Sequence, residues 1–180
     1  IVVLSVMNGF QEELRNRILS VASHIEIRGM PQLADWPQIA AIAQTDPHVK
    51  AAAPYVLGQA MITAADANRG ALIRGIDPAR EDTVADIGRH MRRGALTDLK
   101  AGEFGIVLGG DLARGLGVGQ GDSVVVITPQ GTVTPAGTLP RLKSFKVVGI
   151  FEVGMYEFDS GLALIHIEDA QRLYRLDGVS

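Results

Sequence analysis

The sequence predicts an α+β domain from which a long hairpin arm projects. Two runs rich in β-branched and aromatic residues, Asp122–Ile127 and Ser144–Val153, are typical of strands. Other segments carry apolar residues at helical spacing. Between the two strands lies Thr128–Arg141, TPQGTVTPAGTLPR, with three prolines and two glycines. Its length exceeds the two to five residues that usually close a hairpin, and proline stiffens it, so we expect a protruding arm suited to recognition.

Composition supports a folded domain and excludes several functions. Hydrophobic residues make up 47% of the 180 residues and charged residues 21%, which is enough for a packed interior. The formal net charge of −3 argues against a nucleic-acid partner. The chain has no cysteine, which excludes disulfides, thiolate metal sites and a cysteine nucleophile.

The N-terminal segment predicts one continuous helix. An apolar run, Ile1–Leu4, continues into a stretch whose Leu14, Ile18 and Ala22 follow helical spacing. We interpret residues 1–23 as a helix that begins with the last turns of a transmembrane helix, because the apolar run starts without a cap. The alternative is a buried N-terminal helix of a soluble protein.

The next part predicts a strand, a helix and a hairpin. The strand covers His24–Arg28, and the helix covers Trp36–Thr45 with Asp35 as its N-cap. Two apolar runs, 50–63 and 70–77, then predict a hairpin whose turn contains Asp66, Asn68 and Gly70. Between Arg80 and Glu103 only a short helical segment and glycine turns at Gly94 and Gly102 are expected.

Four alternating glycines, at positions 115, 117, 119 and 121, resemble a phosphate-binding loop but occur in the wrong order. A dinucleotide site needs a strand before the glycines and a helix after them. Here a helix, Asp111–Leu116, precedes them and a strand follows. The glycines are therefore expected to end the helix and to form a turn, with no cofactor.

The C-terminal part predicts a strand, Leu162–Ile167, followed by a helix, Glu168–Leu176. A further strand is expected beyond it, so the chain looks truncated at both ends. Glu157 and Asp159, two positions apart, are expected to be solvated loop charges rather than an acid–base pair. Neither catalytic residues nor a metal site are predicted, and the four histidines are scattered singly.

Two stretches carry a resemblance to a known family. SVMNGFQEELRNRIL at positions 5–19 resembles the end of the first transmembrane helix of the LolC/LolE/LolF permeases of lipoprotein-releasing ABC transporters. The stretch from Gly105 to Arg175, with its glycine turn, Pro-rich arm and IEDAQRL helix, is similar to the distal part of their periplasmic domain.

The resemblance implies a MacB-like periplasmic core with two subdomains. A porter-like βαβ subdomain would comprise residues 24–72 and 154–180, and a mainly-β subdomain, residues 73–153, would be inserted in it and carry the arm at 128–141. Residues 1–23 would be the end of the first transmembrane helix and its periplasmic extension. The chain that follows would be periplasmic, in a protein of the inner membrane.

The resemblance also implies a role for the arm. LolC-like subunits carry a hook that captures the periplasmic chaperone LolA, and the arm matches the hook's TP-x-G-x-x-P core, which favours a LolC-like or LolF-like subunit over LolE. The implied chaperone-binding residues are Val133, Thr134, Pro135, Ala136, Gly137, Leu139, Pro140, Arg141 and Lys143.

The resemblance further implies partners and leaves rivals open. The implied partners are LolA, a lipoprotein substrate, a second permease subunit that is LolE-like or a second copy, and a cytoplasmic LolD-type ATPase. One rival is a MacB-like efflux permease domain that contacts an adaptor protein. Another is a small soluble enzyme using Glu157, Asp159 and His166.

Overall fold

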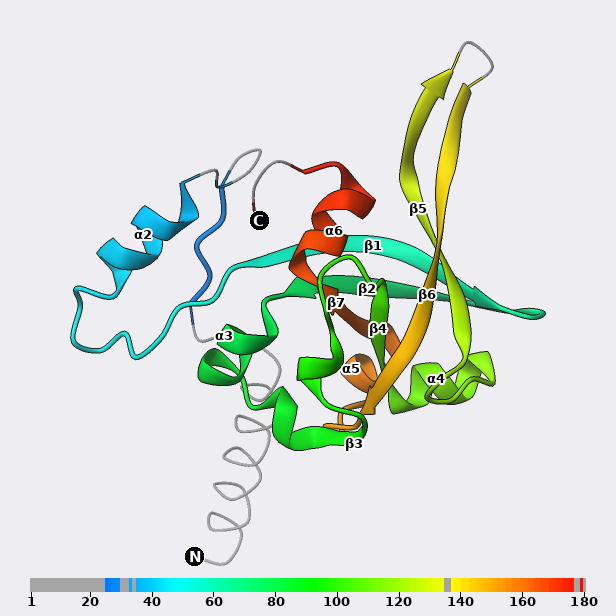
Figure 1. Cartoon of the computed structure of the whole chain (residues 1–180), viewed down its shortest axis with the longest axis horizontal. Helices are drawn as coiled ribbons and strands as arrows, with labels where there is room; N and C mark the ends of the chain where they lie inside the picture. Colours follow the sequence, from blue (N-terminus) through cyan, green and yellow to red (C-terminus); the bar gives the residue numbers. More distant parts are fainter. Residues whose placement is uncertain (1–24, 30–32, 34, 135–136, 177–178, 180) are drawn as a thin grey trace, which may run out of the picture.

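A computed structural model describes residues 25–29, 33, 35–134, 137–176 and 179. Figure 1 shows the order of the elements along the chain. The helices are α2 (Trp36–Ala43), α3 (Pro78–Val84), α4 (Gly110–Leu116), α5 (Tyr156–Gly161) and α6 (Ile167–Tyr174), with short 3-10 helices η1 (Ile87–His90) and η2 (Leu96–Asp98). The strands are β1 (Tyr55–Ala64), β2 (Ala67–Ile76), β3 (Met91–Arg93), β4 (Gly105–Gly109), β5 (Ser123–Thr134), β6 (Gly137–Phe151) and β7 (Leu162–His166).

The strands form one sheet that closes on itself. Their order is β3-β6-β4-β7-β2-β1-β5, and β5 also pairs with β6. β6 makes this closure possible because it is long: its first half pairs with β5 and its second half, Lys146–Phe151, pairs with β4. Six strands thus form a ring, and β3 is attached to it through the end of β6.

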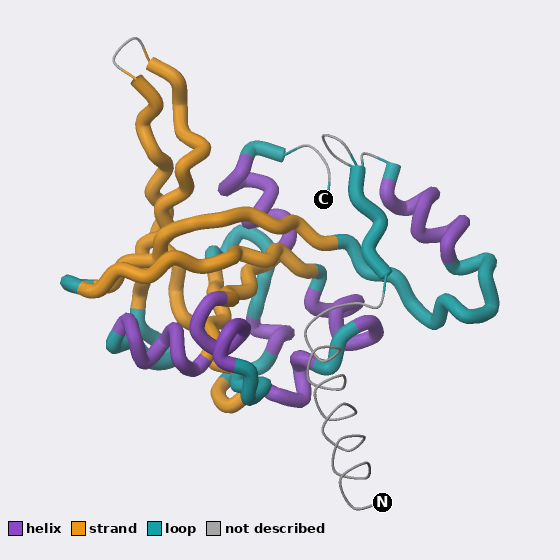
Figure 2. Tube along the Cα trace, turned by 180° about the vertical axis from the view of Figure 1, so that it is seen from behind, coloured by secondary structure: helices purple, strands orange, loops and turns teal. Residues whose placement is uncertain are grey.

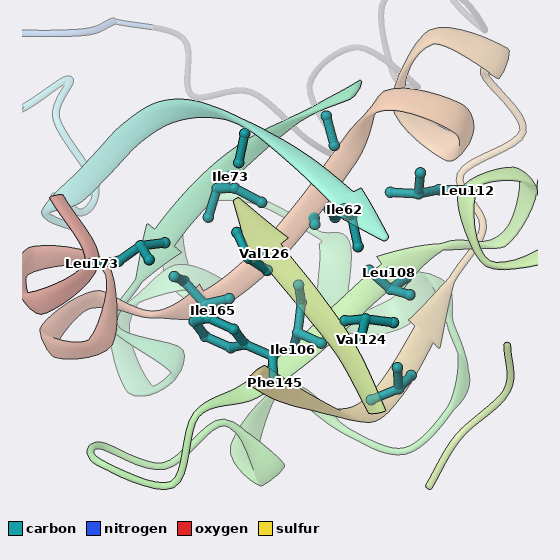
Figure 3. Packing of buried hydrophobic residues seen from close by; sticks show 14 of the residues in the cluster. Ile62, Ile73, Ile106, Leu108, Leu112, Val124, Val126, Phe145, Ile165 and Leu173 are labelled. Atoms are coloured by element: carbon teal, nitrogen blue, oxygen red, sulfur yellow. The ribbon is translucent and has the colours of Figure 1, made fainter. Parts of the chain in front are cut away.

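The main core fills the ring of strands (Figure 3). Alternate residues of each strand point inward, as the pleat requires: Val56 and Ile62 of β1 are buried, as are Ile106 and Leu108 of β4. Leu112 of α4 and Leu173 of α6 join the same cluster. The two helices therefore bury their apolar faces against the strand interior.

A second core covers the outer face of part of the ring. Val107, Phe151 and Leu164 come from β4, β6 and β7, and they pack with Ile87 and Leu96 of the two 3-10 helices. β4 is consequently buried on both faces, which explains its uninterrupted apolar sequence.

Close approach of α6 to the β1–β2 hairpin depends on two glycines. A Cβ at Gly58 would lie 2.2 Å from the ring of Tyr174, and one at Gly75 would lie 2.3 Å from the Cβ of Ala170. The Tyr174 hydroxyl donates to the carbonyl of Gln59 at 3.2 Å. Burial raises the pKa of Tyr174, so this hydroxyl stays a donor.

The predicted α+β class and several elements are confirmed. The β1–β2 hairpin, α4, β7 and α6 lie within a few residues of their expected positions. Gly117 ends α4 with a φ of 69°, and Gly94 and Gly102 also have positive φ, as expected of glycine turns.

Other expectations are wrong. Residues 25–29 belong to no strand, because no segment among the residues that the structure describes pairs with them. Asp35 precedes α2, but its side chain makes no capping hydrogen bond. The hairpin turn is tighter than expected, since Asn68 and Gly70 lie inside β2.

The expected helix at residues 1–23 and the start of the strand at His24 lie outside the described residues. Within the described part, no helix is long and apolar enough to cross a membrane. The division into residues 24–72 with 154–180 and residues 73–153 stays a prediction. Strands from both segments share the ring, since β2 pairs with β7, and β7 with β4.

Candidate functional site

The arm is a two-stranded ribbon built from the ends of β5 and β6. Figure 1 and Figure 2 both show it projecting beyond the other elements. Its lower part belongs to the ring, where β5 and β6 pair continuously from Ser123↔Lys146 to Thr128↔Arg141. Its outer part pairs from Thr132↔Leu139 to Thr134↔Gly137. The two strands, which were expected to end at Ile127 and to begin at Ser144, therefore both continue into the arm.

A register shift separates the two parts of the arm. It lies between Thr128 and Thr132, and the opposing strand has only Pro140 between Leu139 and Arg141. Pro129 and Pro140 both lie in this interval and are exposed. A proline has no N–H to donate to a ladder, so the shift falls where the sequence cannot sustain regular pairing. Bulges of this kind bend a ribbon, and we call this interval, residues 129–131 with Pro140, the hinge of the arm.

The predicted chaperone-binding residues divide into two groups. Val133, Thr134, Gly137 and Leu139 lie in the outer part of the arm, where the backbone ladder brings them together. Pro135 and Ala136 lie outside the described residues. Pro140, Arg141 and Lys143 lie at the hinge and below it.

Both basic residues of the predicted site contact the body of the domain. Arg141 Nη1 donates to the carbonyl of Leu173 at 3.2 Å, in the last turn of α6. Lys143 Nζ lies 3.7 Å from the centroid of the Phe104 ring, a cation–π contact. The two side chains therefore join the lower arm to neighbouring elements.

Buried Asp169 links these contacts. Its carboxylate accepts from the backbone N–H of Gly102 at 2.9 Å and of Phe104 at 3.2 Å. Phe104 also makes an edge contact with Phe145 of β6, with 5.6 Å between ring centroids. α6, the loop before β4 and the lower arm thus form one connected unit.

An apolar row on the outer face of the ring was not predicted. Met61, Ile127 and Leu142 lie side by side, because Met61 pairs with Ile127 and Ile127 with Leu142. Met61 is 48% exposed and Leu142 64%. Alternation along β1 and β5 marks them as facing outward, but which strands are neighbours follows only from the closed topology.

An apolar cleft of about 370 Å³ lies between α2 and the residues that lead into β1. Trp36 and Ile39 of α2 line it, together with Ala51, Ala52 and Ala53. Its small side chains leave the space open, and the alanine run is the sequence signal that could have indicated it. None of the described residues that line the cleft belongs to the arm.

The candidate acid–base residues do not form a catalytic arrangement. Glu157 and Asp159 lie in α5, so the expectation that they occupy a loop is wrong. Asp159 is buried, and its two oxygens accept from the N–H groups of Val153 and Gly154, each at 2.9 Å. His166 caps α6, its Nδ1 accepting from the N–H of Glu168 at 3.3 Å. These three hydrogen bonds hold the backbone at the start of α5 and α6, so both side chains have structural roles.

Residues 1–179 match the model of the MacB-like periplasmic core domain family. The chain belongs to this family.

Among similar proteins are lipoprotein-releasing system transmembrane proteins. The chain is 49% identical over 178 residues to LolC of Neisseria meningitidis, covering 98% of this chain and 43% of that protein. It is 44% identical to LolC of Xylella fastidiosa, over 100% and 44%, and 28% identical to LolE of Haemophilus influenzae, over 95% and 42%. The predicted LolC-like resemblance is confirmed. The chain spans less than half the length of these relatives.

Two solved structures share the fold. The periplasmic region of MacB from Actinobacillus actinomycetemcomitans matches with a TM-score of 0.50 and 13% identity, over 83% of this chain and 59% of that one. The extracellular domain of the transporter YknZ from Gram-positive bacteria matches with 0.52 and 11%, over 86% and 76%. The expected MacB-like core is thus confirmed at the level of the fold.

Proposed function

We propose that this chain is the periplasmic domain of a lipoprotein-releasing ABC transporter permease of the inner membrane, and that its arm docks the chaperone LolA. The whole protein would transfer outer-membrane lipoproteins to that chaperone. ATP hydrolysis would belong to a separate LolD-type subunit. The domain itself would act mechanically, and two of its relatives are named as transmembrane proteins of a lipoprotein-releasing system.

The observation that carries the proposal is the projecting ribbon of β5 and β6. Its outer part, Thr132–Thr134 with Gly137–Leu139, pairs only within itself and lies beyond the ring (Figure 1). Val133 and Leu139 lie on this ribbon, and ladder hydrogen bonds restrict its backbone before binding. Less conformational entropy is then lost on docking.

The lower arm offers a second area for the same partner. Met61, Ile127 and Leu142 form an apolar row directly below the hinge, in which Met61 and Leu142 are exposed and Ile127 is half-buried. A chaperone seated on the outer arm would cover this row, and burial of apolar surface stabilises such complexes. Arg141 and Lys143 would then border the contact area while holding the arm in place.

Site-specific photocrosslinking tests the proposal. A photoreactive residue is placed at Val133 or at Leu139 in the full-length permease, with Ala79 on the exposed face of α3 as the control position. We expect saturable crosslinks to LolA from the two arm positions and none from the control. Equal yields from all three positions, or none from the arm, would refute the proposal.

A MacB-like efflux permease domain that contacts an adaptor protein remains the alternative function. Likeness of fold to the periplasmic region of MacB favours it. The same photocrosslinking separates the two, because an efflux permease would crosslink to a periplasmic adaptor instead of LolA.

A further inference from the structure

Arg141 occupies a distinctive place in the arm. It belongs to the last regular pair, Thr128↔Arg141, before the register shift. The next residue outward is Pro140. Arg141 therefore lies immediately below the hinge, in the first pair of the ribbon that belongs to the ring.

Its hydrogen-bond partner is the carbonyl of Leu173, in the last turn of α6. Helices commonly leave carbonyl groups of the last turn without an intrahelical donor. The end of a helix also carries partial negative charge, which favours a cation. The guanidinium of Arg141 donates to this carbonyl at 3.2 Å in a partly buried position.

α6 is a firm attachment point. Tyr174 is bonded to Gln59 and fills the space above Gly58, and Ala170 packs on Gly75. At the other end, buried Asp169 holds the loop before β4 through two N–H groups. A contact with Leu173 consequently connects Arg141 of β6, through α6, to the β1–β2 hairpin.

We propose that Arg141 is a positioning residue for the arm. Its bond to α6 fixes the lower arm, so that bending is confined to the hinge above it and the outer ribbon keeps one direction. Without this bond the flexible interval extends downward into the ring. Its consequence for partner capture rests on the proposed function. Arg141 would then affect LolA binding by orienting the arm.

The direction of the arm can be measured without any partner. The chain has no cysteine, so Thr132→Cys on the arm and Ala79→Cys on α3 accept two nitroxide labels selectively. Double electron–electron resonance then gives the distance distribution between them in three otherwise identical proteins: Arg141, Arg141→Ala and Arg141→Lys.

Lys146→Ala is the matched control. Lys146 is an exposed cation of the same strand, and it lies inside the ring, where it pairs with Ser123 and Gly105. Circular dichroism establishes that every variant is folded before the distances are compared.

The inference requires one pattern of results. We expect a narrow distribution in the native protein and in the control, a broader or displaced one in Arg141→Ala, and recovery in Arg141→Lys. An unchanged distribution in Arg141→Ala, or equal broadening in the control, overturns the inference.

The affinity of LolA separates this inference from the proposed function. Loss of one hydrogen bond that orders the arm should weaken LolA binding by about threefold to tenfold in Arg141→Ala. Absence of LolA binding to the native protein would refute the proposed function alone, since the distance measurement needs no chaperone.

Discussion

Arg74 and Glu81 form a buried ion pair, with 3.1 Å between Nη2 and Oε1. The two side chains are 11% and 2% exposed, and they join β2 to α3. The Arg74 guanidinium also lies over the Tyr55 ring, 5.1 Å from its centroid. The pair attaches α3 to the hairpin, in a part of the sequence where only a short helical segment was expected.

Removing one partner of this pair should destabilise the domain strongly. Arg74→Met leaves the Glu81 carboxylate buried without its cation, and we expect the free energy of unfolding to fall by about 3–5 kcal/mol. Replacing both, Arg74→Met with Glu81→Leu, should recover most of that loss, because no charge stays unpaired. Urea unfolding at pH 7 measures both effects. Equal losses in the single and double variants would contradict the assignment.

The same pair predicts a pH dependence. Burial raises the pKa of the Glu81 carboxyl above its ordinary value of 4.5, although Arg74 acts in the opposite direction. In the window above 4.5 the folded state therefore binds more protons than the unfolded state, so stability falls as the pH rises through it. Glu81→Gln lacks this contribution. The free energy of unfolding of the native protein, relative to that of Glu81→Gln and measured from pH 4 upward, should therefore fall as the pH rises above 4.5. A difference that stays constant with pH would exclude the raised pKa.

Substitution of Gly58 should displace α6. A Cβ there would lie 2.2 Å from the ring of Tyr174, so Gly58→Ala should cost about 1–3 kcal/mol of stability. Gly70→Ala is the matched control in the same hairpin, because nothing lies within 4 Å of its added Cβ. Thermal unfolding compares the two. Similar melting temperatures would mean that α6 does not approach β1 as closely as described.

Asp169 should be far more important than its neighbour Glu168. Asp169→Ala leaves the N–H groups of Gly102 and Phe104 without their acceptor, and we expect a loss of about 2–4 kcal/mol. Glu168→Ala removes an exposed pair with Arg172 and should change stability by less than about 1 kcal/mol. Chemical unfolding of both variants checks this ranking. A larger loss in Glu168→Ala would reverse it.

The sequence predicted the turns and helix ends, because these depend on residues that are neighbours along the chain. Turn residues indicated the β1–β2 hairpin, and the glycine after Leu116 indicated the end of α4. Closure of the ring was not predictable, because it depends on β6 pairing with β5 along one half and with β4 along the other. The segment 25–29 carries an alternating pattern but has no paired strand.

The candidate site shows the same division. Three prolines and two glycines indicated a protruding arm, but the sequence could not show that both strands continue through it. Arg141 and Lys143 were assigned to partner contact by position along the chain. Their contacts with Leu173 and Phe104 depend on elements that lie far away in sequence. The row of Met61, Ile127 and Leu142 was missed for the same reason.

The arm should be removable without loss of the fold. Thr128 and Arg141 are directly paired, so Asn-Gly in place of residues 129–140 can close the lower hairpin with a two-residue turn. The ring of strands is complete below this point. We expect the thermal unfolding temperature of the armless domain to stay within about 3 °C of the native value.

Binding of LolA to the native and armless domains is the measurement that tests the central claim most directly. Isothermal titration calorimetry with purified LolA should give saturable binding to the native domain and none to the folded armless domain. Equal affinity for both would contradict the claim that the arm docks the chaperone.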